Sequence, residues 1–267
     1  MRLGSSIRTY LAGSLLYGWA LPDRPRIFYY QTKAYLDRFL LKRKSANRIV
    51  SVKAGGDVVH FRDNWFDPRS LADVFVNDYN SLDPGIFAGL ASFVDVGANA
   101  GFISLCARRA SPGCRIFCFE PLEGNAALCR LNNPDAVVEQ SGIGSRRGKM
   151  RLLVDAAGFM ASSLRFGYDQ SGKDVPLLTL DGYFAGKGIV PDLIKIDVEG
   201  MEVEVASGGK KTIQSAKRVI AEVHSRKLLS AFRDVMGSYG LRERACRKVE
   251  GEVCISDWIN TGGRPRP

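Results

Sequence analysis

Short apolar runs that alternate with helical segments constrain the fold of this chain most strongly. From residue 92 onward, the runs SFVDVG, RIFCFEP, LIKIDVEG and RVIAEVH are separated by segments with helical patterns. Continuous apolar strands joined by helices are typical of a mostly parallel sheet with helices on both faces. We therefore predict an α/β protein whose ligands bind beyond the carboxyl ends of the strands.

Other patterns predict elements outside this alternation. Between residues 144 and 178, loop residues separate GKMRLLV from SSLRF, which predicts a β-rich insertion between the third and fourth core strands. Ahead of the sheet, the spacing of aromatic and aliphatic residues predicts a helix within residues 26–45 and a hairpin over 49–62. A further helix is predicted over 70–80, with Ser70 as its N-cap.

The positive charge of the chain lies in its two end segments. The 267 residues include 38 Lys and Arg against 28 Asp and Glu, a net charge of +10. Residues 1–48 hold ten basic and two acidic side chains, residues 49–209 hold 15 and 20, and residues 210–267 hold 13 and 6, so they contribute +8, −5 and +7. The acidic middle argues against a nucleic-acid surface over the whole chain. We predict a basic helical appendage over residues 1–48 and one main domain over residues 49–267.

The N-terminal segment has two interpretations. Arg2 and Arg8 precede an apolar stretch over residues 10–21, but glycines interrupt the stretch and a basic segment continues to Arg48. The stretch is shorter than the roughly 18–20 apolar residues that span a membrane. The segment is either a helical cap packed on the main domain or a peripheral element on an anionic membrane surface.

The cysteine pattern indicates the compartment. Six cysteines form no CxxC pair, and the chain has two histidines, so ligands for a Cys/His zinc site are lacking. Four of the cysteines fall in apolar segments, where a reduced cysteine behaves as a small apolar side chain. We expect a cytoplasmic protein.

A glycine-containing loop joins the first core strand to its helix. In VDVGANAG, residues 94–101, an apolar strand ends in Asp95 and opens through Gly97 and Gly101 into a helix. Glycines let the backbone approach a ligand closely, and a helix N-terminus offers unpaired N–H groups. The next strand ends at Glu120, where an acidic side chain can accept the hydroxyls of a ribose. The pattern predicts a cofactor that contains adenosine.

The residue at position 102 distinguishes between two cofactors that contain adenosine, S-adenosylmethionine and NAD. A dinucleotide fingerprint needs its third glycine there, and Phe102 occupies the position, so S-adenosylmethionine is favoured over NAD. A flavodoxin-like turn without a cofactor is the alternative. The predicted cofactor-binding residues are Asp95, Gly97, Asn99, Gly101, Phe102, Glu120, Pro121, Gly142 and Asp197.

The order of several motifs resembles a known family. VDVGANAGF, FCFEP, TLDGYF and DLIKIDVEGMEVEV follow one another as in the FkbM-type S-adenosylmethionine-dependent methyltransferases. The resemblance covers residues 70–225 of the chain. It implies a class I, Rossmann-like methyltransferase fold with a seven-stranded, mostly parallel sheet, and O-methylation, often of sugars or other glycosylated small molecules. For residues 1–48 it implies nothing.

The KIDVEG segment carries three alternating ionisable residues. Lys195, Asp197 and Glu199 point to one side for as long as the strand persists. Such groups are costly in a buried strand unless they serve one another or a ligand. The resemblance places Asp197 near the methionine end of the cofactor or near the acceptor. Glu199 and Glu202 have an alternative explanation as carboxylates that begin the next helix.

Glu222 and His224 alternate in the same way along the next apolar run, AEVHS. An imidazole with a pKa of about 6.5 suits removal of a proton from an acceptor hydroxyl near neutral pH. A structural histidine is the alternative for His224, and His60 on the predicted hairpin is interpreted as structural. We predict Asp197, Glu222 and His224 as the catalytic residues.

The remaining predictions concern the acceptor, a metal and competing functions. The predicted acceptor-binding residues are Tyr79, Asn80, Ser162, Ser163 and Glu199. Metal-free transfer is favoured, and Mg²⁺ held by Asp197, Glu199 and Glu222 is the alternative. Two other functions stay open. One is an RNA methyltransferase that uses the basic flanks, and the other is a non-catalytic cofactor-binding module at a membrane surface.

Overall fold

The computed structural model describes residues 24–41, 47–54, 57–76, 85–154, 161–162 and 172–261. The apolar stretch over residues 10–21 lies outside the described residues, as do Tyr79, Asn80 and Ser163. The chain divides into two compact units, residues 1–86 and residues 87–267. The predicted domain boundary after residue 48 does not coincide with this division.

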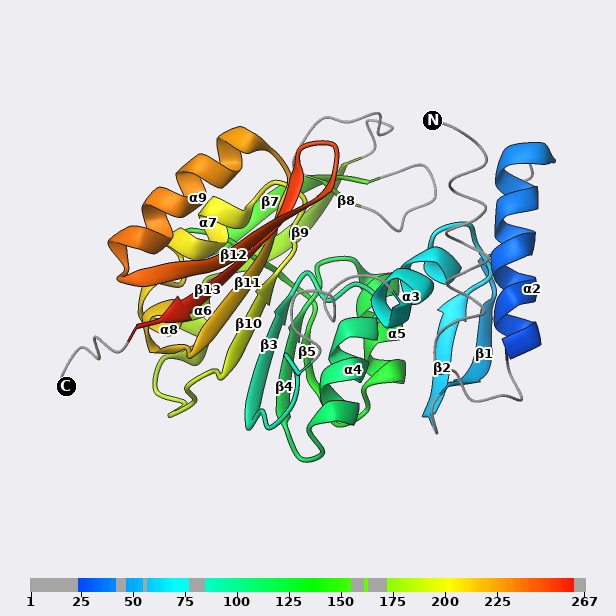
Figure 1. Ribbon diagram of the computed structural model, residues 1–267, viewed down its shortest axis with the longest axis horizontal. Helices are drawn as coiled ribbons and strands as arrows, with labels where there is room; N and C mark the ends of the chain where they lie inside the picture. The colour runs from blue at the N-terminus through cyan, green and yellow to red at the C-terminus, as the bar shows by residue number, and fades with distance from the viewer. Residues whose placement is uncertain are drawn as a thin grey trace. The chain divides into compact units, whose positions relative to one another are not determined.

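The first unit contains helical segments and one hairpin (Figure 1). Its elements are α2 (Arg24–Tyr35), the π-helix η2 (Leu36–Leu40), β1 (Ile49–Ala54), β2 (Asp57–Arg62) and α3 (Asp67–Val76). β1 and β2 pair antiparallel, and Val52 lies opposite Val59 with both side chains buried. His60 on β2 contacts Ser51 across this pair, Nδ1 to Oγ at 2.8 Å.

Helix α3 begins three residues before the predicted start at Ser70, so Ser70 is not its N-cap. The Asn64 side-chain oxygen accepts the backbone N–H groups of Phe66 at 2.9 Å and Asp67 at 2.7 Å. The buried Asp67 carboxylate also receives the Arg62 guanidinium, Nε to Oδ2 at 2.8 Å and Nη2 to Oδ1 at 2.9 Å. The Asn64 bonds satisfy two backbone N–H groups at the start of the helix, a role that sequence spacing assigned to Ser70.

The second unit is built on a seven-stranded sheet in the order β12-β13-β11-β10-β3-β4-β5 (Figure 1). The strands are β3 (Ser92–Val96), β4 (Arg115–Phe119), β5 (Val137–Glu139), β10 (Leu193–Ile196), β11 (Arg218–Val223), β12 (Leu241–Glu250) and β13 (Val253–Asn260). The five strands from β11 to β5 are parallel, and β13 runs antiparallel to both of its neighbours. The predicted seven-stranded, mostly parallel sheet is thereby confirmed.

Helices cover the sheet on two sides, with α4 and α5 on one and α7 and α9 on the other (Figure 1). The helices are α4 (Phe102–Ala110), α5 (Glu123–Asn132), α6 (Leu180–Phe184), α7 (Glu202–Ser207), α8 (Lys210–Ser215) and α9 (Arg226–Ser238). Every residue of β3 and β10 is buried, which explains why both strands read as continuous apolar runs. None of the helices in the described residues is long and apolar enough to span a bilayer.

The predicted β-rich insertion forms a separate four-stranded sheet in the order β6-β9-β7-β8. Its strands are β6 (Gly142–Ile143), β7 (Gly148–Val154), β8 (Ala161–Ser162) and β9 (Gly172–Leu178). These strands lie in sequence between β5 and β10, the third and fourth strands of the parallel core. The insertion is therefore where the broken rhythm of the sequence predicts it.

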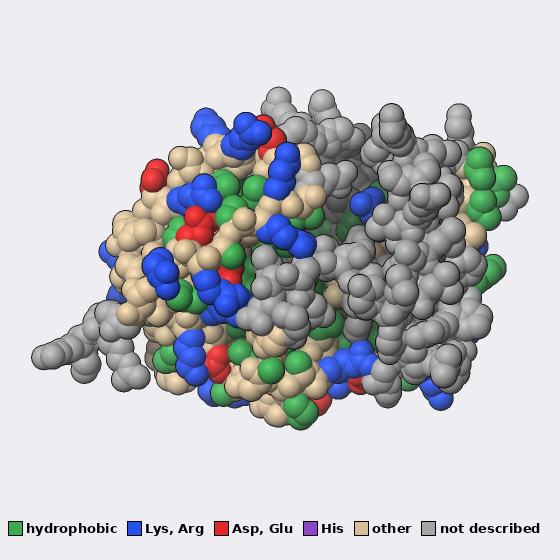
Figure 2. Space-filling view, in the orientation of Figure 1, with side chains coloured by type: hydrophobic (Ala, Val, Ile, Leu, Met, Phe, Trp, Pro, Cys, Tyr) green, Lys and Arg blue, Asp and Glu red, His purple; other side chains and the backbone are tan. Residues whose placement is uncertain are grey.

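Part of the basic excess near the C-terminus is used in ion pairs. Arg218 and Arg244 both contact the buried Asp257, at 2.8 Å and 2.6 Å, and Arg233 contacts Glu243 at 2.9 Å. Figure 2 shows Lys and Arg side chains spread over the described part of one face, with Asp and Glu side chains between them. The ion pairs of Asp257 join β11, β12 and β13, and the pair of Arg233 joins α9 to β12. A share of the positive charge is therefore structural.

Candidate active site

The loop after β3 requires glycine at two positions. Gly97 and Gly101 have φ angles of 81° and 78°, and Asn99 between them has a φ of 50°. These values lie in the left-handed region, which glycine adopts without steric cost. A Cβ atom on Gly97 would overlap the backbone carbonyl oxygen of Asp197, and one on Gly101 would overlap the Asn133 side chain. The loop is thus packed directly on the segment that follows β10.

Two asparagines at the C-terminal end of α5 form hydrogen bonds with this loop. Asn132 Nδ2 donates to the Ala100 carbonyl at 2.8 Å, and Asn133 Nδ2 donates to the Gly101 carbonyl at 2.9 Å. Both asparagines are buried, and sequence reasoning missed them. The only signal was the pair of adjacent amides at the end of a helix.

Glu120 lies where β4 ends and is almost fully buried. Its Oε2 accepts the Asn99 N–H at 2.9 Å, and its Oε1 accepts the Leu122 N–H at 2.9 Å and Asn125 Nδ2 at 3.3 Å. Burial raises the pKa of this carboxyl, although these hydrogen bonds oppose the shift. A carboxylate has about four lone-pair sites, so three donors leave capacity on Oε2 for a ligand hydroxyl.

Lys195 links the loop to the acidic residues. Its Nζ lies 2.9 Å from the Gly97 carbonyl oxygen, 3.2 Å from Asp95 Oδ1 and 3.4 Å from Asp197 Oδ2. Asp95 is fully buried and also accepts the Ser104 hydroxyl at 2.7 Å. The carboxylates raise the lysine pKa although burial opposes them, so Lys195 is a cation. We did not predict a site role for Lys195. The signal in the sequence was a charged residue within the otherwise apolar strand LIKI.

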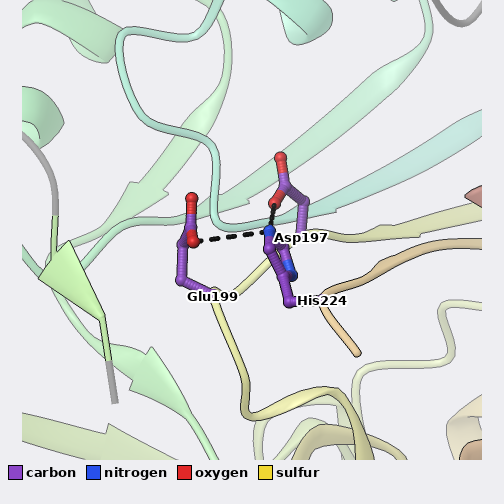
Figure 3. Close-up of side chains that lie close together, drawn as sticks. All are labelled: Asp197, Glu199 and His224. Atoms are coloured by element: carbon purple, nitrogen blue, oxygen red, sulfur yellow. Dashed lines mark ion pairs between the residues drawn. The ribbon is translucent and has the colours of Figure 1, made fainter. Parts of the chain in front are cut away.

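His224, just after β11, faces carboxylates on both sides of its ring. Nδ1 lies 2.8 Å from Glu202 Oε1, whereas Nε2 lies 3.4 Å from Glu199 Oε2 and 3.9 Å from Asp197 Oδ1. Figure 3 shows Asp197 and Glu199 converging on the same edge of the ring. The structure therefore brings together the residues predicted from KIDVEG and AEVHS.

Burial and the charges of this cluster together shift three pKa values. Burial lowers the pKa of His224, but the Glu202 hydrogen bond and the nearby carboxylates outweigh it and raise the value to about 10. Burial, with the charge of Asp197 next, raises the pKa of Glu222 to about 8. Burial also raises the pKa of Glu199 to about 7. The expectation that His224 titrates near 6.5 is wrong for this arrangement, because the ring is surrounded by acids and stays protonated at neutral pH.

One side-chain trio could hold a metal ion. Asp197, Glu199 and His224 each offer a ligand atom, and these atoms lie within 4.8 Å of one another. The predicted metal set had Glu222 in place of His224. Because Lys195 already lies 3.4 Å from Asp197 and His224 is cationic, two positive charges compensate these carboxylates within the protein.

Four other predicted site residues are not part of this acidic cluster. Phe102 begins α4 and is buried, and Pro121 follows Glu120. Gly142 begins β6, where a Cβ atom would press on Leu177 at 2.8 Å. Ser162 ends β8 in the insertion.

Comparisons with known proteins identify a methyltransferase domain in this chain. The profile of the Methyltransferase FkbM domain matches residues 95–243. The 2-O-methyltransferase NoeI of Sinorhizobium fredii is 29% identical over 188 residues, which is 61% of this chain and 77% of NoeI.

Solved structures give weaker likenesses. The ribosomal protein L11 methylase of Lactobacillus delbrueckii subsp. bulgaricus is 8% identical with a TM-score of 0.46, over 73% of this chain and 79% of the methylase. The fibrillarin pre-rRNA processing protein of Methanococcus jannaschii is 11% identical with a TM-score of 0.45, over 80% and 82% of the two chains.

The parallel sheet, the glycine loop and the family match define a methyltransferase that depends on S-adenosylmethionine. The chain belongs to the FkbM methyltransferase family, since the profile covers more than half of its length. The loop fits this cofactor. Asn99 Oδ1 is buried and has no hydrogen-bond partner in the part of the chain that the structure describes, and Gly97 leaves no room for a side chain where the loop meets Asp197.

Proposed function

We propose that this protein is an O-methyltransferase that methylates a hydroxyl of a sugar or of a glycosylated or lipid-like small molecule. The observation that carries the proposal is the position of Lys195 Nζ, within 3.4 Å of both the Gly97 carbonyl oxygen and Asp197. One ammonium group thus joins the cofactor loop to an acidic cluster that can receive a proton. The name of NoeI, a 2-O-methyltransferase, supports hydroxyl rather than amine methylation.

We assign the cofactor to residues around the loop. Gly97, Asn99 and Gly101 would line it, Glu120 would accept its ribose hydroxyls, and bound S-adenosylmethionine supplies a methyl group on a sulfonium centre. Asp95, Phe102, Pro121 and Gly142 support this site. Methyl transfer is an in-line displacement, so the protein chiefly aligns the acceptor and removes its proton.

Asp197 is the group we assign to the acceptor proton. Its carboxylate is partly exposed, unlike that of Asp95, and it lies between two cations, Lys195 and His224. His224 is protonated at neutral pH, so it cannot accept the proton of the acceptor hydroxyl there. We assign it to orienting the acceptor and balancing the charge of the carboxylates. Glu222 and Glu199 complete the polar wall, and Ser162 and Ser163 of the insertion are proposed to contact the acceptor.

Replacing Asp197 with asparagine tests this assignment. The amide retains the size of the side chain but cannot take the hydroxyl proton, so kcat should fall about 100-fold or more. Binding of S-adenosylhomocysteine should change little. The assay follows transfer of a labelled methyl group to a panel of alkyl glycosides and nucleotide sugars. Asp234→Asn, an exposed position on α9, is the matched control. Equal turnover in both variants would refute the role of Asp197.

Metal removal tests the other part of the proposal. We expect turnover to be unchanged after treatment with EDTA, because Lys195 and His224 already compensate the carboxylates. The measurement compares initial rates before chelation, after chelation and after added Mg²⁺ or Mn²⁺. A rate that is lost with EDTA and restored by either ion would show that the metal-free version is wrong.

A further inference from the structure

Glu202 is a buried carboxylate at the first residue of α7. Its side chain is fully buried, and Oε1 accepts the Gly200 N–H at 2.9 Å while lying 2.8 Å from His224 Nδ1. Its other oxygen, Oε2, has no hydrogen-bond partner among the described residues. Glu202 does lie in the first turn of α7, as the alternative explanation has it, but a position at the start of a helix does not account for the contact with His224.

A buried carboxylate at this position is expensive. Removing an ionised group from water costs much more than removing an amide or an apolar side chain of similar volume, and one of its oxygens is left without a donor. A side chain that only filled space under α7 would not need the charge. The contact with His224 is an ion pair with a cation, and it explains why a charged side chain stands here.

The contact also distinguishes the two nitrogens of the imidazole. Because Nδ1 is engaged by Glu202, Nε2 is the nitrogen that faces Glu199 at 3.4 Å and Asp197 at 3.9 Å. Figure 3 shows Nε2 as the ring atom joined to both carboxylates. A ring flip would place a carbon atom where Nδ1 lies and leave the buried Glu202 without this hydrogen-bond partner. Such a carboxylate contact is a general means of fixing the orientation of a histidine ring.

We propose that Glu202 is a positioning residue that holds His224 with Nε2 directed at Asp197 and the acceptor. This inference rests on the proposed function, since it specifies how that site is kept in order. Charged groups face the ring from each surrounding element: Asp197 and Glu199 after β10, Glu202 on α7 and Glu222 on β11. Of these, Glu202 is the one whose contact is with Nδ1.

The composition of the chain makes a spectroscopic test simple. It contains only two histidines, His60 and His224, so ¹⁵N-labelled histidine gives two sets of ring signals in the full-length protein. Wild-type His224 should show a slowly exchanging, downfield Nδ1 proton. Glu202→Met removes the acceptor at similar volume, so this proton signal should disappear, whereas Glu202→Gln keeps an acceptor oxygen and should retain it. The His60 signals serve as an internal reference.

Kinetics and a matched control complete the test. With the best acceptor of the glycoside panel, Glu202→Met should lower kcat by about 100-fold, the scale expected when a catalytic group is misplaced by about 1 Å, while the KM for S-adenosylmethionine changes little. Glu202→Gln should recover part of the loss. Glu204→Met, exposed on the same short helix, should match the wild type in both measurements.

The possible outcomes distinguish a failure of this inference from a failure of the proposed function. A wild-type His224 without a protected Nδ1 proton would overturn the inference, even if Glu202→Met failed to fold. So would a Glu202→Met variant that retains both that signal and the wild-type kcat. In contrast, a wild-type protein with the Nδ1 signature but with no methyl transfer to any hydroxyl acceptor would refute the proposed function and leave the contact itself intact.

Discussion

Replacing Gly97 with alanine is expected to abolish cofactor binding. The new Cβ atom would overlap the Asp197 carbonyl oxygen, and the φ angle of 81° is unfavourable for any other L-residue. The loop must therefore move away from β10, and the contact of Lys195 with the Gly97 carbonyl is lost with it. Calorimetric titration with S-adenosylhomocysteine should show no heat of binding, and the free energy of unfolding should fall by about 1–3 kcal/mol.

Gly113→Ala is the matched control for this prediction. Gly113 has a similar φ angle of 85°, but a Cβ atom there would meet nothing within 4 Å. This variant isolates the cost of the backbone conformation from the overlap with Asp197. It should lose some stability and still bind the cofactor product. If Gly97→Ala bound the product as well as Gly113→Ala does, the loop would not be the cofactor site.

Replacing Lys195 with methionine is expected to have the largest effect on stability. The substitution leaves Asp95 fully buried without the ammonium of Lys195, and the Ser104 hydroxyl cannot replace that charge. Breaking a buried ion pair by removing one partner costs about 3–5 kcal/mol. Chemical denaturation should show this loss in the free energy of unfolding. Any protein that still folds should have a greatly reduced kcat, because Asp197 loses the same partner.

An exposed lysine provides the comparison. Lys217 also forms an ion pair, with Asp192 at 2.5 Å, but 77% of its side chain is exposed. Lys217→Met should therefore cost at most about 1 kcal/mol, as for other surface pairs. Similar losses in the two variants would mean that Lys195 is not the central cation of a buried network.

The strands of the sheet are predictable from the sequence because β3 and β10 are buried along their whole length. A fully buried strand is apolar at most positions, and the buried Asp95 and Lys195 are neighbours that pair with each other, so a short apolar run still marks each strand. The glycine loop is predictable for a similar reason, since Gly97 and Gly101 are required by backbone geometry. In contrast, the start of α3 depends on the Asn64 side chain, and spacing alone placed it at Ser70.

The partners of the site residues are not predictable in the same way. Lys195 lies beside Asp95 because β10 and β3 are neighbours in the sheet with these two residues in register. They are 100 positions apart in the chain, and no local pattern fixes that register. The His224 pKa also depends on tertiary structure, because Glu202 and Glu199 approach the ring only after α7 packs near β11. A pKa near 6.5 was therefore the wrong expectation.

The central claim is that the loop over residues 97–101 and the cluster around Lys195 form one methyltransferase site. Calorimetric titration of the full-length protein with S-adenosylhomocysteine, in parallel with Gly97→Ala, tests it most directly. We expect one binding site in the wild type and none in the variant. At ligand concentrations of about 1 mM, the titration misses only binding free energies weaker than about −4 kcal/mol. If the wild type shows no binding under these conditions, the claim is wrong.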